Sequence, residues 1–271
     1  MSRDITALQI KAKELRRDVL DMIYSARSGH LGGSLSEMEI MVALFHNEMN
    51  FSGNNKNDPN RDRLVLSKGH TAPALYVNLA DVGCFPRERL FDSYRRVDGL
   101  LQGHPSMKTP GVEIAGGSLG IGLSVATGMA IGNRYQDYEG RIYCIMGDGE
   151  INEGQIWEAA ATAANYSVDN LCAFVDVNGL QNDAPTKDVK DMGDIAAKWN
   201  AFGWYVQEID GHDFNEIFAA LDHARAMKGK PSVILAHTIK GRGVSFMENV
   251  VVWHGKTPSE EEYLKARREL L

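Results

Sequence analysis

Short apolar runs alternate with helical patterns through most of this chain, and that alternation limits the folds it can adopt. Strands separated by helices form right-handed crossovers, which give a mostly parallel sheet covered by helices on both faces. The chain is therefore predicted to be an α/β protein. Its 271 residues, 44% of them hydrophobic, suffice for a single large domain over 1–271. The runs predicted to be strands are 63–67, 141–146, 170–177, 204–209 and 231–239.

The N-terminal segment is predicted to be helical. Apolar residues at helical spacing indicate a long amphipathic helix that begins at Asp4 and ends at Gly29. Segment 28–36 is rich in glycine and serine, and we expect it to be a loop. Ser36 and Glu39 have the spacing of a capping box, which predicts that a second helix follows directly.

Charge and cysteine content exclude several classes of function. The 29 basic and 36 acidic residues give a net charge of −7, and without a long basic run neither a nucleic-acid nor a membrane partner is expected. Cys84, Cys144 and Cys172 are odd in number and widely spaced, which favours buried, reduced thiols over disulfides or a cysteine zinc site. The amphipathic start has no apolar signal core, and no later run is apolar enough to span a bilayer. We expect a cytoplasmic protein.

A carboxylate and an amide stand just beyond two of the predicted strands, with one helix between them. They are Asp148 and Asn178. Ligands of parallel α/β sheets bind at this edge, and Mg²⁺ takes oxygen ligands together with phosphate and water. Taken alone, Gly-Asp-Gly is typical of a turn and Asn178-Gly179 of a hairpin. Together they favour a metal site formed by Asp148, Asn178 and a main-chain carbonyl near Leu180.

Glycine-rich chain and two lysines are suited to holding an anion. The stretch "GGSLGIGLSVATGMAIG" begins at Gly116 and leads into a helix of small residues. Its main-chain N–H groups could bind a phosphate, although close helix packing explains the glycines equally well. No Gly-Lys-Ser/Thr follows, so it is not a Walker loop. Lys68 and Lys240 each lie beside glycine at a predicted sheet edge, which suits a diphosphate, whereas most lysines are simply solvated.

Among the eight histidines, we single out four that lie next to glycine in predicted loops. A single histidine is more often a surface or core residue than a catalytic one. Four in this context favour proton transfer near neutral pH, which draws on imidazole. Zinc is the rival use, but the chain has neither an H-E-x-x-H helix nor paired thiols. These histidines are His30, His70, His104 and His254.

In this order, the motifs resemble the thiamine diphosphate-binding N-terminal domain of transketolases. The "GDG" to "N" element is general to thiamine diphosphate enzymes, whereas the contexts of the four histidines are specific to transketolases. The resemblance extends over nearly the whole chain and implies the thiamine diphosphate-binding fold, in its diphosphate-binding domain. The matching motifs are "SGHLGGSLS", "LVLSKGHTAPALY", "LQGHPSM", "GGSLGIGLSVATGMAIG", "GDGEINEGQIWEAA", "VDVNGLQ" and "IKGRGVSFMENVVVWHGK".

The resemblance implies a role for each candidate residue. Mg²⁺, with Ca²⁺ or Mn²⁺ as substitutes, would be bound by Asp148, Asn178 and the Leu180 carbonyl. Glu153 and Glu158 resemble the acids near the subunit interface that connect paired sites. The implied catalytic set is His30, His70, His104 and His254. The residues implied to contact the cofactor are Lys68, His70, Gly117, Ser118, Leu119, Gly149, Glu153, Glu158, Asn178, Lys240 and His254.

The chain departs from the family pattern at two residues and in its length. Leu31 replaces a common proline and Gly33 an occasional serine, so contacts near the first histidine are expected to differ in detail. A full transketolase continues into a pyrimidine-binding domain and a third domain. The chain therefore resembles the free-standing N-terminal subunit of a split transketolase, with both domains, and the glutamate that activates the cofactor, expected on a C-terminal partner chain. Two copies of each chain are expected.

The implied function is transfer of a two-carbon ketol unit from a ketose phosphate to an aldose phosphate. Two alternatives remain open. One is a subunit of another thiamine diphosphate enzyme, either of the deoxyxylulose-phosphate synthase type or one that decarboxylates 2-oxo acids. The other is a regulatory subunit that binds the cofactor without turnover. The spaced histidines favour transketolase, since a polyhydroxylated donor needs more hydrogen-bonding side chains than pyruvate does.

Overall fold

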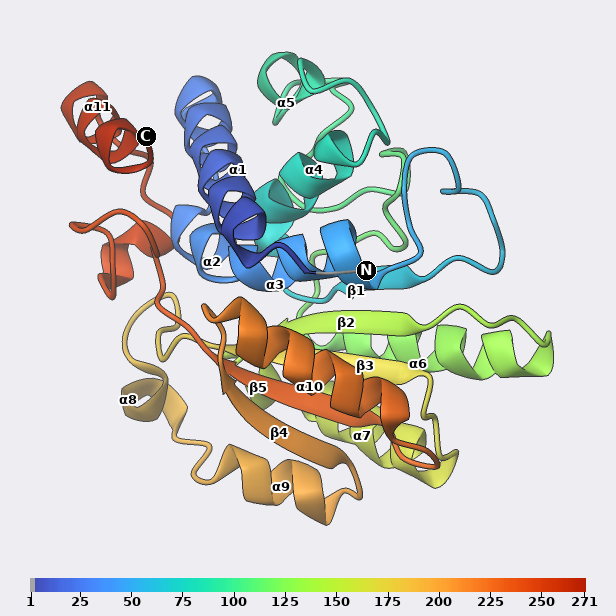
Figure 1. Ribbon diagram of the computed structural model, residues 1–271. Helices are drawn as coiled ribbons and strands as arrows, with labels where there is room; N and C mark the ends of the chain where they lie inside the picture. The colour runs from blue at the N-terminus through green and yellow to red at the C-terminus, as the bar shows by residue number, and fades with distance from the viewer. Residues whose placement is uncertain (1–2) are drawn as a thin grey trace.

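A computed structural model describes residues 3–271 and shows a five-stranded sheet between layers of helices (Figure 1). The strand order is β1-β2-β3-β5-β4, and every neighbouring pair is parallel. The predicted α/β class and parallel sheet are confirmed. The strands are β1 (Arg63–Leu66), β2 (Ile142–Gly147), β3 (Leu171–Val177), β4 (Tyr205–Asp210) and β5 (Ser232–His237).

Helices connect the strands and precede the first of them. Short helical turns occur at Leu44–Glu48, Gly69–Thr71, Glu150–Asn152 and Val251–His254. The α-helices are α1 (Ile5–Ala26), α2 (Leu31–Ser36), α3 (Met38–Ala43), α4 (Ala72–Asp81), α5 (Arg89–Asp92), α6 (Ile121–Tyr135), α7 (Gly154–Asn165), α8 (Thr186–Lys190), α9 (Ile195–Ala201), α10 (Phe214–Ala226) and α11 (Glu260–Glu269).

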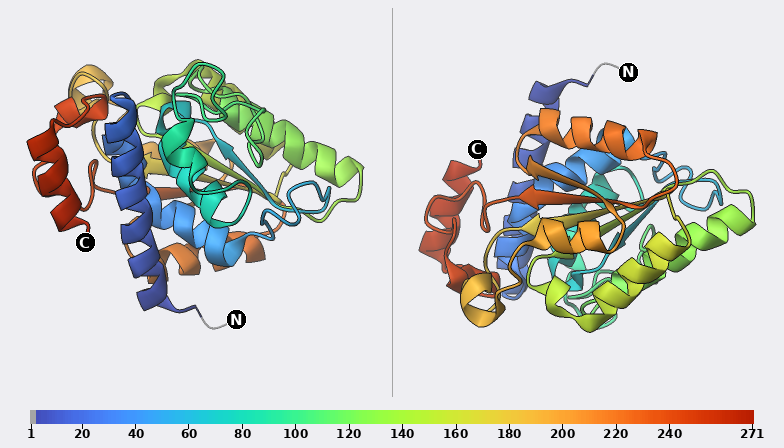
Figure 2. Two further views of the ribbon diagram at one scale, coloured as in Figure 1. Left: turned by 90° about the horizontal axis from the view of Figure 1, so that it is seen from above. Right: turned by 90° about the horizontal axis from the view of Figure 1, so that it is seen from below.

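Side chains alternate along each strand, so each face of the sheet has its own apolar layer. On β2, Tyr143 and Ile145 belong to the layer that contains residues of α1 to α4 and α10. Cys144 and Met146, the next residues along, belong to the opposite layer, with α6 and α7. All four are buried. Helices thus cover both faces of the sheet (Figure 2).

The segment predicted to be a loop, 28–36, contains helix α2, so that prediction was wrong. All six residues of the helix are buried, and His30 occupies its N-cap position. A Cβ on Gly32 would lie 2.9 Å from the Lys240 Cγ atom, and one on Gly33 would lie 2.7 Å from the Thr71 Cγ2 atom. These glycines serve close packing rather than a turn, a distinction that depends on residues distant in sequence.

The predicted capping box of Ser36 and Glu39 is also wrong. Helix α3 has Glu37 at its N-cap and no side-chain capping bond. The Ser36 hydroxyl donates instead to Asp176 at 2.7 Å. Glu39 accepts both terminal nitrogens of Arg16, a buried pair between α3 and α1. Long-range partners have replaced the local cap.

The first and last helices of the chain pack together. Helix α1 begins after the predicted Asp4 cap, whose carboxylate accepts the Ala7 N–H, but it ends at Ala26, before Gly29. Helix α11 packs beside α1, where Tyr263 stacks on Tyr24 with ring centroids 3.9 Å apart (Figure 1). The C-terminal segment thus completes the layer of α1.

Two further expectations concern thiols and membrane spans. All three cysteines are buried and free, as predicted. Burial raises the pKa of Cys84 to about 11 and that of Cys172 to about 12, which leaves both thiols protonated and unreactive at neutral pH. Across residues 3–271 the helices are too short or too polar to cross a membrane.

The Arg16–Glu39 pair gives a pH-dependent test of the fold. Burial alone would raise the Glu39 pKa, but the charge of Arg16 and hydrogen bonds from His212 and Arg16 lower it to about 2. A depressed carboxyl pKa means that this stabilisation is complete above the ordinary value of 4.5 and is lost as the pH falls through about 2. Glu39→Gln should cost about 3 kcal/mol at pH 7, because Arg16 would stay buried without a counter-charge.

Urea unfolding over a range of pH measures this effect. The difference between wild type and Glu39→Gln should shrink below pH 4.5. Glu14→Gln, which removes a partly exposed ion pair with Lys11, is the control and should change stability by less than about 1 kcal/mol. A Glu39→Gln difference that stays constant from pH 7 down to the acid limit would contradict the assignment.

Candidate active site

A cavity of about 470 Å³ opens where β1, β2, β3 and β5 end. Most of the residues singled out from the sequence line it, although they come from segments far apart in the chain. The site residues that line the cavity are Lys68, His70, His104, Gly117, Leu119, Asp148, Gly149, Glu153, Asn178, Leu180, Lys240 and His254.

Three of the predicted site residues do not line the cavity. His30 lies behind the wall, with its ring centroid 5.3 Å from that of His70. Ser118 is exposed between two lining residues, Gly117 and Leu119. Glu158 is exposed on α7, outside the cavity. Its predicted role at a subunit interface is untested by a single chain.

Asp148 is a buried carboxylate at the end of β2. Its Oδ1 accepts the N–H of Gly149 at 2.8 Å and its Oδ2 accepts the N–H of Gly179 at 2.6 Å. Burial, with the nearby charge of Asp176, raises the Asp148 pKa to about 6. A carboxylate that is costly to ionise when alone gains strongly from a cation beside it.

Asn178 is oriented by the acid two residues earlier in β3. Its Nδ2 donates to Asp176 Oδ2 at 3.0 Å. A carboxylate only accepts, so this bond identifies the amide nitrogen and directs the amide oxygen away from Asp176. That oxygen accepts the Leu180 N–H at 3.2 Å. The Leu180 carbonyl accepts from Lys240 Nζ at 2.8 Å.

The donor set fits a hard divalent cation bound together with a diphosphate. Asp148 supplies a carboxylate, Asn178 an amide oxygen and Leu180 a carbonyl, all lining one cavity. Within residues 3–271, no group of three or more His, Cys, Asp and Glu could hold a metal ion. A cation here would therefore take the rest of its shell from phosphate and water.

Lys240 is the cation best placed for a diphosphate. Burial lowers its pKa to about 8, with a further contribution from Lys68. Its Nζ contacts the Leu180 carbonyl and lies 2.9 Å from His254 Nδ1. Because an ammonium only donates, His254 accepts at Nδ1, and a neutral ring then carries its proton on Nε2.

The four histidines of the sequence prediction form one cluster. Ring centroids lie 5.4 Å apart for His30 and His254, 5.1 Å for His70 and His254, and 6.4 Å for His30 and His104. Burial lowers the pKa of His30 to about 4 and that of His254 to about 3, helped by the charge of Arg95 on the first and of Lys240 on the second. The imidazoles are neutral at pH 7, so each can donate at one nitrogen and accept at the other.

The glycine-rich segment adopts the conformation expected of a loop that approaches a ligand. Gly117 has φ +146° and open space where a Cβ would stand, so its backbone, not its packing, requires glycine. Glu150 accepts the N–H of Gly120 at 2.9 Å and of Gly147 at 3.0 Å. This buried acid ties the start of α6 to the end of β2.

A buried charge cluster lies under the cavity and was not predicted from the sequence. Lys68 contacts Asp176 and lies 3.0 Å from Glu37, and all three side chains are almost fully buried. Burial alone would lower the Lys68 pKa, but the two acids raise it. Lys68 lines the cavity, yet its charge is already matched by protein. Asp176 is an acid within the otherwise apolar run of β3, and this was the feature of the sequence that could have indicated a buried charge pair.

The segment after Asn178 supplies lining residues that were also not predicted. Gln181, Asn182, Val189 and Lys190 belong to it and to α8. Helix α8 has no buried residue, so no apolar pattern marked its face of the cavity.

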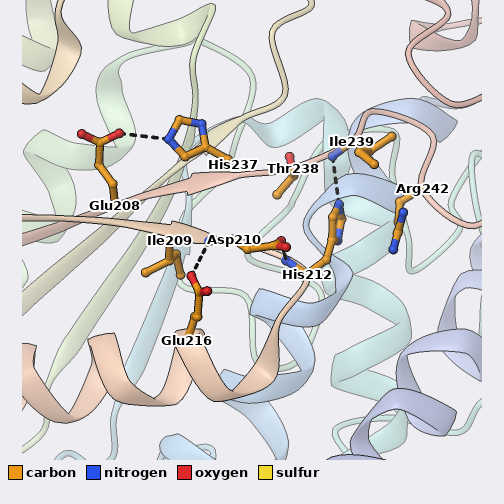
Figure 3. Close-up of a pocket in the computed structure, with 9 residues that line it drawn as sticks. All are labelled: Glu208, Ile209, Asp210, His212, Glu216, His237, Thr238, Ile239 and Arg242. Atoms are coloured by element: carbon orange, nitrogen blue, oxygen red, sulfur yellow. Dashed lines mark hydrogen bonds and ion pairs between the residues drawn. The ribbon is translucent and has the colours of Figure 1, made fainter.

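A second cavity, of about 530 Å³, opens at the ends of β4 and β5 (Figure 3). Its polar side chains are largely paired. His237 contacts Glu208 at 3.0 Å, and His212 accepts the Ile239 N–H at 2.9 Å. Most of the residues predicted from the sequence line the first cavity and none lines this one, so the first cavity is the candidate active site.

The same fold occurs in known proteins. A family model described as "Transketolase, thiamine diphosphate binding domain" matches residues 8–271. The transketolase of Campylobacter jejuni superposes with a TM-score of 0.92 at 32% identity, covering 99% of this chain and 43% of that one. The fold and site define a thiamine diphosphate-binding α/β domain.

The chain belongs to the transketolase family. The 6-deoxy-6-sulfo-D-fructose transketolase subunit SqwG of Clostridium sp. (strain MSTE9) is 44% identical over 271 residues, covering 100% of this chain and 98% of the relative. One of the subunits of the apulose-4-phosphate transketolase of Phocaeicola vulgatus is 37% identical, covering 98% and 94%. Human transketolase is 39% identical, but the match covers only 40% of its length. The family resemblance inferred from the motifs is confirmed.

Replacing Asp148 by Ala should abolish Mg²⁺-dependent binding of thiamine diphosphate, because it removes the only anionic protein ligand expected for the cation. Calorimetry of the chain with its expected partner measures this. Asp183→Ala, which removes an exposed carboxylate in the neighbouring loop, is the matched control. Unchanged cofactor affinity in Asp148→Ala would remove it from the metal site.

Proposed function

We propose that the chain is the N-terminal subunit of a thiamine diphosphate- and Mg²⁺-dependent transketolase, transferring a two-carbon ketol unit from a ketose phosphate to an aldose phosphate. The observation that carries this proposal is the convergence of the Asp148, Asn178 and Leu180 oxygens with His70, His104 and His254 on one cavity. The oxygens suit a cation that neutralises a diphosphate, and the imidazoles suit a polyhydroxylated sugar.

The chain's own residues would bind the cofactor and handle donor protons. Thiamine diphosphate, when bound, supplies an electron sink for cleavage beside a carbonyl. Lys240 and the cation would neutralise its diphosphate. The neutral ring of His254, with Nδ1 held by Lys240, offers Nε2–H as a donor to a sugar oxygen. His104 lines the cavity and His30 lies close behind it, where they could accept or return hydroxyl protons.

A partner chain is part of the proposal. Relatives that match this chain along nearly their whole length are named as subunits, whereas human transketolase is much longer. A C-terminal subunit would supply the pyrimidine-binding pocket and the activating glutamate. The expected assembly has two copies of each chain.

Exposed apolar side chains support such association. Around α6 and α7, the exposed fraction is 47% for Ile121, 82% for Tyr135 and 53% for Tyr166. Leu119, at the cavity, is 40% exposed. Apolar residues gathered on one side of a molecule are typical of an interface.

The two alternative functions are less well supported. Family membership and the histidine cluster favour ketol transfer over decarboxylation, since pyruvate offers few hydroxyl groups for four imidazoles. A non-catalytic regulatory role is opposed by the presence of every candidate metal, lysine and histidine position. Turnover of ketose phosphates by the two-subunit complex separates all three functions.

His30→Ala and His254→Ala should lower turnover by roughly 10²-fold to 10⁴-fold, the range for loss of an acid-base group. Cofactor binding should be nearly unchanged, because the diphosphate would be held by Lys240 and the cation. Steady-state kinetics and calorimetry of the reconstituted complex measure the two effects. His223→Ala, on α10 and far from the cavity, is the control. Normal turnover in both site variants would assign these histidines a structural role.

Without a partner, the chain should fold but not catalyse, because the activating glutamate is expected on the other subunit. Exchange of the cofactor's C2 proton with deuterium, followed by NMR, is a direct measurement. The rate should stay near that in solution with this chain and increase by orders of magnitude when the partner is added. Fast exchange and ketose cleavage by the single chain would overturn the split-subunit proposal.

A further inference from the structure

Arg95 is a partly buried cation without a carboxylate partner. Within residues 3–271 no acid lies at ion-pair distance from its guanidinium. The residue has φ +50°, in the left-handed region that L side chains rarely adopt, and its N–H donates to the Leu101 carbonyl at 2.8 Å. The backbone of Arg95 is therefore strained but fixed, and its guanidinium has no carboxylate to balance its charge.

The guanidinium joins the two loops that end in His30 and His104. Its Nη1 donates to Ser28 Oγ at 2.9 Å, two residues before His30. Its other face lies against Gly103, where a Cβ would be 2.8 Å from the Arg95 Cζ atom. Only glycine leaves room for this contact directly before His104.

A buried tyrosine pair supports the same two loops. Tyr94 OH accepts from Arg95 Nε at 3.2 Å, and the rings of Tyr94 and Tyr76 meet edge to face with centroids 6.3 Å apart. The single hydrogen of the Tyr76 hydroxyl is shared between the carbonyls of Gln102 and His104, at 2.9 and 3.1 Å. Arg95 thus rests on the same buried aromatic pair that holds the backbone of His104.

We propose that Arg95 is a positioning residue that fixes the loops of His30 and His104 relative to each other and so determines how the ketose donor is held. This inference rests on the proposed function. Arg95 does not line the cavity, so it acts on the donor through the histidines and not by contact.

Arg95 also affects His30 and His104 through its charge. Burial lowers the pKa of both His30 and His104, and the Arg95 charge lowers both further. The other groups that face His30 are His70, His104, His254 and Lys240, and His30 itself faces His104. None of these groups is an acid, so the charge of Arg95 helps keep both imidazoles neutral. A neutral imidazole can both donate a hydrogen bond to a hydroxyl group of the ketose and accept one from it.

Three variants separate position from charge. Arg95→Met removes both. Arg95→Lys keeps a charge but loses the planar fork that spans Ser28 and Tyr94. Ser28→Ala removes one bond and leaves the charge. Arg96→Met removes an exposed arginine at the adjacent position and is the control.

NMR titration of the histidine rings in the full chain is the first measurement. The midpoints of His30 and His104 should rise in Arg95→Met and stay unchanged in Ser28→Ala and Arg96→Met. This measurement needs no turnover, so it decides the inference even if the complex fails to transfer ketol units, which would overturn only the proposed function. Unchanged midpoints together with unchanged ring chemical shifts of both histidines in folded Arg95→Met would overturn the inference.

Kinetics of the reconstituted complex are the second measurement. Arg95→Met and Arg95→Lys should lower kcat/KM for the ketose donor by roughly 10-fold to 100-fold, the effect of small misplacement in a site. Ser28→Ala should show a smaller loss, and thiamine diphosphate affinity should be unchanged in all. If Arg95→Met fails to fold, Arg95→Lys and Ser28→Ala provide the test. Unchanged donor kinetics in both, or an equal loss of cofactor affinity, would overturn the positioning role.

Discussion

The buried ion pair between Lys68 and Asp176 connects the segments that surround the cavity. Asp176 also accepts from Ser36 at the end of α2, from Thr238 after β5 and from Asn178 after β3. One carboxylate thus connects most of the strand ends that form the cavity. Burial alone would raise its pKa, but the Lys68 charge and these hydrogen bonds keep it below its usual range. A buried pair is a weak source of net stability, yet removing one partner is costly, so it favours a single arrangement of the loops.

The charges around the cavity also keep the four clustered histidines uncharged. Lys68 and Lys240 line the cavity close to imidazoles, and the charge of Lys68 is matched by Glu37 and Asp176. Lys240 lies against His254, and Arg95 lies near His30. Positive charge and burial both disfavour imidazolium. The imidazoles of the cluster are therefore neutral donors and acceptors, and Lys240 remains the cation available for an anionic group.

Prediction from the sequence succeeded where the signal is local. The strand runs, the Asp4 cap of α1 and the strand-end positions of Asp148 and Asn178 follow from residues close together in the chain. It failed for segment 28–36, because glycine permits both a loop and a tightly packed helix. It failed for Ser36 and Glu39 because each found a partner in a distant element, and that partner cannot be read from spacing.

The sequence by itself determined the fold class, the edge of the sheet where the cavity opens and most of the residues that line it. Hydrophobic periodicity and the residue types at strand ends depend on residues close together in the chain, so they can be recognised from the sequence alone. Only the tertiary structure decided which charges are matched and which remain free. Lys68 and Asp176 are 108 residues apart, and Arg95 and Ser28 are 67 apart. Their pairing depends on how the chain packs around the sheet, because burial and the nearest charges set protonation and position, and both are properties of the assembled fold.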